Sequence, residues 1–192
     1  MTIGTPCKKC SAPSPSARLY FGVELCQLVN SIQDLYFIRS GKITHEDEDF
    51  GTQKYDMESD MRPISAILFC TIFDVLMTGL IKNIMLRKSI PQEIQDLLLK
   101  NYQFAMKKRD QLYPKLLKES FLESIKTIKV ETTHDFEPHF DYADKLAKKR
   151  NKFVHKGVKW VFTEDELDNI PHELHPLFSG FVALHNYQND KI

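Results

Sequence analysis

Residues 64–81 read ISAILFCTIFDVLMTGLI, and this stretch decides what kind of fold the chain can adopt. As a helix it is about long enough to cross a bilayer. One charged residue, Asp74, interrupts it near its middle, accompanied by the polar Ser65, Thr71 and Thr78. Because an aspartate at the bilayer centre costs on the order of 3 kcal/mol, the sequence favours a helix buried in a protein core. No membrane partner is therefore expected.

Amphipathic patterns on both sides of this stretch supply the helices that would cover it. Apolar residues spaced three and four apart predict a helix over 17–38, and an acidic loop without periodicity follows at 42–57. The other expected helices span 62–87, about 89–109, 115–129, 138–156 and 171–186, and Thr163 opens a further short helix. A break is expected at Pro114, and a connection at 130–135. The pattern predicts an all-α bundle of about six or seven helices in one domain, residues 17–192.

Composition is that of an ordinary globular protein, with 42% hydrophobic and 27% charged residues. Lysine plus arginine (26) balances aspartate plus glutamate (26), so no global basic field indicates nucleic-acid binding. Any contact with RNA must come from a local patch.

The N-terminal residues 1–16 are rich in proline and serine and predict a flexible tail. Cys7 and Cys10 in this tail could supply half of a zinc site, but the other half is missing nearby, so no metal or other cofactor is expected. Cys26 and Cys70 lie in apolar helical runs and are expected to be small buried hydrophobes. Few cysteines and the lack of a secretory signal predict a cytoplasmic protein.

The helix expected at 138–156 contains the chemically suggestive residues. On a helical wheel its residues divide into an apolar arc and a polar side opposite to it. The apolar arc contains Phe140, Tyr142, Ala143, Leu146, Ala147, Phe153 and Val154. The polar side contains Asp141, Lys145, Lys148, Lys149 and Lys152. Arg150 breaks this division, because it lies near the middle of the apolar arc, where packing alone would select leucine or isoleucine. An arginine there must be paired or must lie in a crevice open to water.

Asn151 and His155 lie four residues apart at the edge of the same arc, on a ridge that Asp144 and Lys148 continue. One helix thus presents a permanent cation, Arg150, near an imidazole that titrates close to neutral pH. Cleavage of RNA by its own 2′-hydroxyl needs a base, an acid and positive charge on the phosphorane, which histidine and arginine can supply. Since one histidine cannot conveniently serve as both acid and base, a two-fold dimer would bring two copies together without any metal.

The segment Arg150-Asn151-Lys-Phe-Val-His155 resembles the signature of the HEPN superfamily, an arginine followed after four to six residues by a histidine, with a polar residue after the arginine. The resemblance implies a helical bundle that dimerises through the 138–156 helix and acts as a metal-independent endoribonuclease in toxin–antitoxin or phage-defence systems. It assigns Arg150 and His155 as catalytic and Asn151 as a supporting residue, with Lys148, Lys152 and Lys156 binding RNA. Gly157 stands where one toxin subgroup has tyrosine, which argues against that subgroup and leaves any antitoxin protein partner open.

Two alternatives remain open at this stage. One is a non-catalytic HEPN-like module that binds RNA or a protein through the lysines at 148, 149, 152, 156 and 159. The other is a structural or regulatory helical protein in which Arg150 forms an ion pair with Asp74, the lone charge of the central helix. That pair is also compatible with catalysis, because a buried carboxylate can hold a catalytic arginine in place.

Overall fold

The computed structural model describes residues 31–32, 57–156 and 161–191, and all regular structure within these ranges is helical. This confirms the all-α prediction. There are six helical rods when the contiguous α4, η1 and α5 are counted as one. The elements are α2 (Met57–Arg87), α3 (Gln92–Asn101), α4 (Ala105–Lys107), the π-helix η1 (Lys108–Leu112), α5 (Tyr113–Leu117), α6 (Phe121–Thr132), α7 (Glu137–Lys156) and α8 (Glu164–Asn189).

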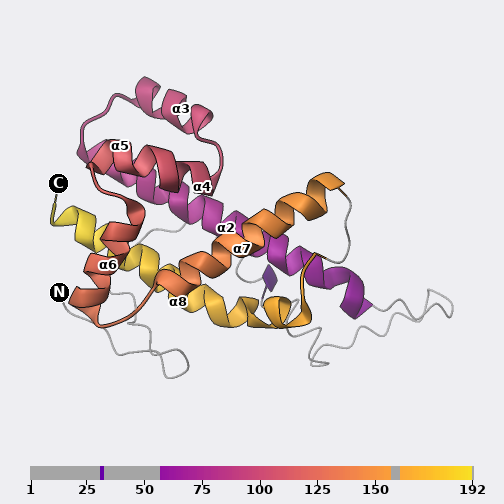
Figure 1. Cartoon of the computed structure of the whole chain (residues 1–192). Helices are drawn as coiled ribbons and strands as arrows, with labels where there is room; N and C mark the ends of the chain where they lie inside the picture. Colours follow the sequence, from indigo (N-terminus) through magenta and orange to yellow (C-terminus); the bar gives the residue numbers. More distant parts are fainter. Residues whose placement is uncertain (1–30, 33–56, 157–160, 192) are drawn as a thin grey trace.

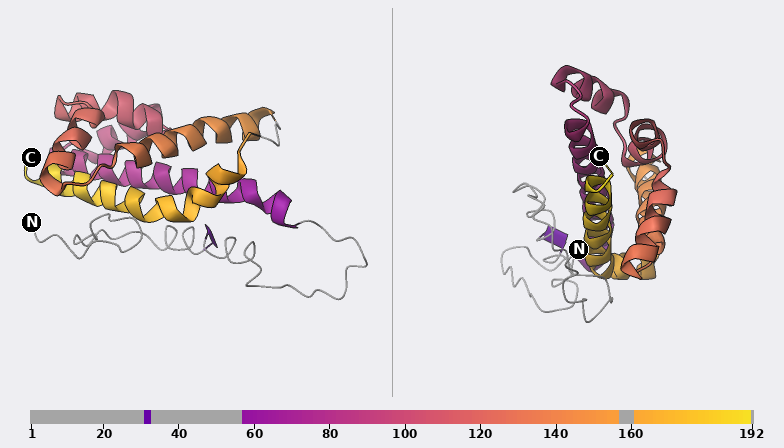
Figure 2. Two further views of the ribbon diagram at one scale, coloured as in Figure 1. Left: turned by 60° about the horizontal axis from the view of Figure 1, so that its bottom comes forward. Right: turned by 90° about the vertical axis from the view of Figure 1, so that its left-hand side faces the viewer.

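The helices form two layers, and the long α2 belongs to one of them, as Figures 1 and 2 show. In one layer α8 runs alongside α2, and in the other lie α7, α6 and the α4–η1–α5 rod. The short α3 lies outside, at the edge of the bundle (Figure 1). Helix α7 therefore packs on both α2 and α8, and its last turns diverge from the start of α8 (Figure 1).

The core is built on α2, whose Phe69, Phe73 and Met77 are fully buried. Aromatic contacts tie the layers together: the Phe73 ring lies 5.9 Å from that of Phe181 on α8. Phe181 also lies 5.3 Å from Phe140 on α7. Gly180 explains how closely these helices approach, because a Cβ there would lie only 3.0 Å from Cε2 of Phe140.

Within helix α2 the segment Pro63–Arg87 is long and apolar enough, by length and composition, to cross a membrane, and an 18-residue window in it has a mean hydropathy of 2.2. Half of this window is buried against the other helices. Ile64 and Val75 are 41% and 42% exposed, so the helix is central but has one open side. Cys70 on the covered side is buried, as predicted.

The predicted helix boundaries between residues 89 and 135 are partly wrong. The expected break at Pro114 does not occur, because Pro114 falls in the first turn of α5, where its missing N–H removes little. The chain instead breaks earlier, at Tyr102–Phe104, and later, at Lys118, which adopts the left-handed conformation with φ 58°. The expected connection at 130–135 also begins too early, because α6 continues to Thr132 and ends at a left-handed Thr133.

The predicted bounds of α7 agree with the structure, whereas those of α8 do not. Helix α7 begins at Glu137 and ends at Lys156, within one residue of the prediction. The capping box formed by Thr163 and Glu166 is confirmed, but the helix that it opens does not stop before 171. It continues through Pro171 and Pro176, because packing of its apolar face offsets the backbone hydrogen bonds that the prolines lose.

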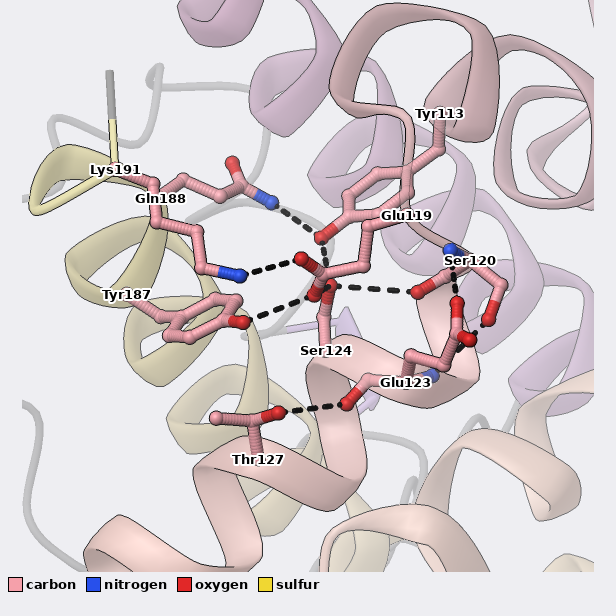
Figure 3. A network of polar contacts seen from close by, with 9 residues as sticks. All are labelled: Tyr113, Glu119, Ser120, Glu123, Ser124, Thr127, Tyr187, Gln188 and Lys191. Carbon is pink, nitrogen blue, oxygen red and sulfur yellow. Dashed lines mark hydrogen bonds and ion pairs between the residues drawn. The ribbon is translucent and has the colours of Figure 1, made fainter.

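A polar network closes one end of the bundle (Figure 3). The fully buried Tyr113 donates its hydroxyl to Ser124 Oγ at 2.7 Å and accepts a hydrogen bond from Gln188 at 2.8 Å. The Glu119 carboxylate accepts from Tyr187 at 2.9 Å and also pairs with Lys191. The network thus fastens the last turns of α8 to the start of α6.

Several sequence predictions fall on residues outside the described ranges. These are the tail at 1–16 with Cys7 and Cys10, the acidic loop at 42–57 apart from its last residue, and the helix terminus at Gly157. Of the helix expected at 17–38, residues 31–32 are described; they are helical, and Ile32 is buried.

Candidate functional site

Helix α7 brings one predicted site residue, Arg150, to Asp74 in the middle of α2. Its buried face consists of Phe140, Ala143, Leu146 and Ala147, in agreement with the predicted apolar arc. Val154 departs from that arc, because it is 54% exposed near the end where α7 leaves the bundle.

The second half of α7 is anchored to the start of α8 through Glu166. This carboxylate is 5% exposed and accepts hydrogen bonds from Lys149 at 2.6 Å and from the N–H of Thr163 at 2.9 Å. Lys145 lies 2.8 Å away. Burial alone would raise the pKa of Glu166, but the two lysines and the Thr163 N–H lower it to about 2. The prediction that Lys149 faces solvent is therefore wrong, since a carboxylate from another helix captures it.

Arg150 lies at the contact of α7 with α2, and its guanidinium pairs with Asp74. The Arg150 Nη2 to Asp74 Oδ2 distance is 3.5 Å, and the two side chains are 21% and 27% exposed. This confirms the pair that the sequence offered as an alternative. The contact is long, and the buried Nε of Arg150 has no hydrogen-bond partner among the described residues. Much of the hydrogen-bonding capacity of this guanidinium is thus unused.

Asp74 is held in place from its other side. Its Oδ1 accepts the backbone N–H of Ala105 at 2.5 Å, at the first turn of α4. A carboxylate at a helix N-terminus is favoured by the free N–H groups and by the helix dipole. Asp74 therefore links three helices: it belongs to α2, it caps α4, and it orients the arginine of α7.

A cavity of about 500 Å³ opens beside this pair. We call it the basic groove, because one carboxylate, Asp74, faces three cations, Lys82, Lys108 and Arg150, along its walls. Its other lining residues are Thr71, Val75, Thr78, Gly79, Gln103 and Phe104. The net positive charge and the partly exposed Arg150 make the groove suitable for an anion such as a phosphate.

Lys108 is the buried cation of the basic groove, at 4% exposure, and sequence reasoning did not single it out. Its Nζ donates to the carbonyl of Gln103 at 2.7 Å. Burial lowers the pKa of Lys108, and the nearby Asp74 opposes this shift. The same surroundings act on the Cys70 thiol, whose pKa burial raises to about 12, with Arg150 opposing the rise and Asp74 adding to it.

Three of the remaining predicted site residues lie on the outer surface of α7. Lys148, Asn151 and Lys152 are exposed. The backbone of His155 and Lys156 continues α7, but their side chains lie outside what the structure describes. Five helical positions separate Arg150 from His155, roughly 7.5 Å along the axis.

Asp144 was expected on the ridge with Asn151 and His155, and the structure buries it instead. It is 7% exposed and pairs with Arg109 of η1. The pattern gave no signal for this pair, because Arg109 lies on a different helix, 35 residues earlier in the chain.

Comparisons with family models, with curated proteins and with solved structures found no match for this chain. Among the described residues, no group of three or more histidine, cysteine, aspartate or glutamate side chains could hold a metal ion.

Proposed function

We propose that this protein is a metal-independent endoribonuclease of the HEPN type, with Arg150 and His155 as its catalytic residues. One observation carries the proposal: Arg150, the arginine of the motif, lines an open basic groove with a side chain that is 21% exposed, and its ion pair with Asp74 is long, at 3.5 Å. An arginine kept only to join two helices would be expected to use most of its donors within the protein.

The proposed reaction is an attack of the RNA 2′-hydroxyl oxygen on the adjacent phosphorus. A His155 imidazole accepts the hydroxyl proton, and a second one, from the partner protomer, donates a proton to the departing 5′-oxygen. The new O–P bond forms as the P–O5′ bond breaks, which leaves a cyclic phosphate and a 5′-hydroxyl. Arg150 binds the phosphorane oxygens, whose charge increases in the transition state.

Other residues have supporting roles in this proposal. Asp74 positions the Arg150 guanidinium, and its capping of α4 fixes its own orientation. The exposed Lys148, Asn151 and Lys152 provide contacts to the RNA backbone, with Lys156 on the next turn. A homodimer through α7, a toxin–antitoxin or defence setting in the cytoplasm, and an antitoxin protein partner belong to the same proposal and come from the family resemblance.

The test uses the purified full-length chain, single-stranded RNA and a readout of new 5′-hydroxyl ends. Arg150→Ala and His155→Ala should each reduce cleavage at least about 100-fold, the usual range for a lost acid–base or oxyanion group. Chelators should leave the wild-type rate unchanged. Arg87→Ala is the matched control, because Arg87 is an exposed helix-end arginine outside the basic groove that donates to the Asn189 carbonyl at 3.3 Å.

Two results would contradict the nuclease proposal. Cleavage by both variants at the wild-type rate would exclude the assigned residues. Salt-sensitive RNA binding without any new ends would instead favour the binding module, a reading that the exposed Lys148 and Lys152 also support.

A further inference from the structure

The basic groove has an apolar wall as well as a charged one. Val75 of α2 and Phe104, the residue before α4, line it and are 42% and 51% exposed. Neither belongs to the hydrophobic core or to the partly buried residues packed on it, whereas Tyr102, two positions before Phe104, packs on the core. A phenyl ring that is half exposed at a cavity wall, beside a second exposed apolar side chain, offers a surface to a flat apolar group.

The cations of the groove lie close to this ring. Asp74 Oδ1 accepts the N–H of Ala105, the residue after Phe104, at 2.5 Å, and Asp74 Oδ2 lies 3.5 Å from Arg150 Nη2. One carboxylate therefore connects the backbone next to Phe104 with the guanidinium. Lys82 is exposed and adds a second accessible cation to the lining. A ligand that matches the groove combines a flat apolar part with an anionic part.

Gly79 contributes to the open space of the groove. It is exposed on α2, and a Cβ there would meet no atom within 4 Å, so the packing of the described residues does not require glycine at this position. The groove, of about 500 Å³, is within the range of small-molecule sites, roughly 300–1,000 Å³. It is therefore large enough for one nucleobase and its phosphate.

We propose that the basic groove is a nucleotide subsite for single-stranded RNA, in which one nucleobase stacks on Phe104 and its phosphate lies at Lys82 and Arg150. Proteins that bind single strands commonly stack bases on aromatic side chains, and the stacking accepts every base because each has a π-face. A duplex does not fit this subsite, because its bases are stacked on one another. The inference rests on the proposed function, since it takes the anion in the groove to be an RNA phosphate, and it adds a requirement for an unpaired base.

The test measures the binding of two uncleavable ligands of equal charge to the full-length protein. One is a short 2′-O-methyl oligoadenylate, whose blocked 2′-oxygen cannot attack the phosphorus, and the other is the same backbone with abasic sugars. The wild-type protein should bind the oligoadenylate about five- to a hundredfold more tightly, the range for one stacked base. Phe104→Ala should bind both ligands alike, and Phe104→Tyr, which keeps an aromatic ring, should keep the preference.

Two further variants serve as controls. Leu97→Ala removes an apolar side chain of similar exposure, 53%, on α3 and outside the groove lining, so it should keep the wild-type preference. Gly79→Leu should fill the groove and weaken the binding of both ligands at least about tenfold. Its melting temperature should not fall, because the new Cβ meets open space and a glycine inside a helix is replaced by a better helix former. This separates a blocked groove from an unfolded protein.

Three results would each overturn the inference: equal affinity of the wild-type protein for the two ligands, a preference that persists in Phe104→Ala, or wild-type binding by Gly79→Leu. Tighter binding of a duplex than of the single strand would do so as well. The cleavage assay gives a separate answer. Cleavage that needs Arg150 and His155 without any base preference would reject the subsite alone, and a base preference without cleavage would reject the nuclease alone.

Discussion

The basic groove differs in charge from a second cavity of about 330 Å³, which we call the acidic pocket. The acidic pocket lies between η1, α6 and α7, and its charged lining residues are Arg109, Asp110, Glu137, Asp141 and Asp144. Lys108 and Arg109 are successive residues of η1, yet Lys108 lines the groove and Arg109 lines the pocket. Helix α7 likewise contributes Arg150 to the groove and Asp144 to the pocket. Since the two cavities share these helices, the charge of each cavity is decided by which side chain the helix turns to which side.

The two arginines differ in how far the protein satisfies them. Arg109 binds two carboxylates, and its side chain is 17% exposed. Arg150 has one contact, at 3.5 Å, and an unpartnered Nε. Arg109 is thus held by two carboxylates of the protein, whereas Arg150 has a single long ion pair among the described residues and lines the basic groove.

The largest expected effect concerns the neighbours Lys108 and Arg109. Arg109→Met should lower the free energy of unfolding by about 3–5 kcal/mol, because it leaves the buried Asp144 without its cation. Lys108→Met should cost only about 1 kcal/mol, since the aliphatic stem remains and one hydrogen bond to the Gln103 carbonyl is lost. Chemical denaturation of both variants measures the difference.

A double variant checks the physical cause of that difference. If the unpaired Asp144 carboxylate is responsible, adding Asp144→Asn to Arg109→Met should recover at least about 1 kcal/mol. Equal losses for Lys108→Met and Arg109→Met would break the comparison, because the two cations would then be equivalent to the fold.

A smaller effect should appear in the pH dependence of stability, with opposite signs for two buried carboxylates. Lys145, Lys149 and the Thr163 N–H outweigh burial and lower the pKa of Glu166 to about 2. The stabilisation that ionised Glu166 gives to the folded protein is therefore present above pH 4.5, its usual pKa. It is lost as pH falls toward 2. Burial raises the pKa of Asp144 above its usual 3.8, and Arg109 opposes this rise. The contribution of Asp144 to the free energy of unfolding is therefore greatest below pH 3.8 and is lost as pH rises.

Unfolding curves of Glu166→Gln and Asp144→Asn, measured from about pH 2 to about pH 7, test this difference. Glu166→Gln should be less stable than the wild type by about 1–3 kcal/mol near neutral pH and should match it at the acid end. For Asp144→Asn the stability relative to the wild type should instead improve as pH rises. Parallel profiles for the two variants would mean that the surroundings of these carboxylates do not differ as described.

The sequence predicted those parts of the site that depend on one helix or on a single conspicuous charge. The bounds of α7 followed from its periodicity, and the Arg150–Asp74 pair followed from two charges placed among apolar residues. The basic groove could not be predicted, because it requires the break at 102–104 that brings Lys108 over α2. That break is stabilised by Asp74 capping Ala105, a contact between residues 31 positions apart that no local pattern contains.

The acidic pocket was missed for a related reason. Asp141 was predicted on the polar side of its helix and Asp144 on the ridge of Asn151 and His155, and only the packing of η1 and α6 against α7 encloses them. Lys149 shows the same limitation, because the carboxylate that captures it comes from the following helix.

The smallest expected effect is on the salt dependence of RNA binding at the outer surface of α7. Lys152 is exposed on the outer surface of α7, so Lys152→Ala should remove one phosphate contact and little stability. The slope of log K against log salt should then fall by about 0.7, the value per phosphate for single strands. Lys100→Ala is the control, because Lys100 is exposed on α3, at the outer edge of the bundle. If both variants reduce the slope equally, RNA responds only to the overall charge of the protein, and the outer surface of α7 has no special role in binding this ligand.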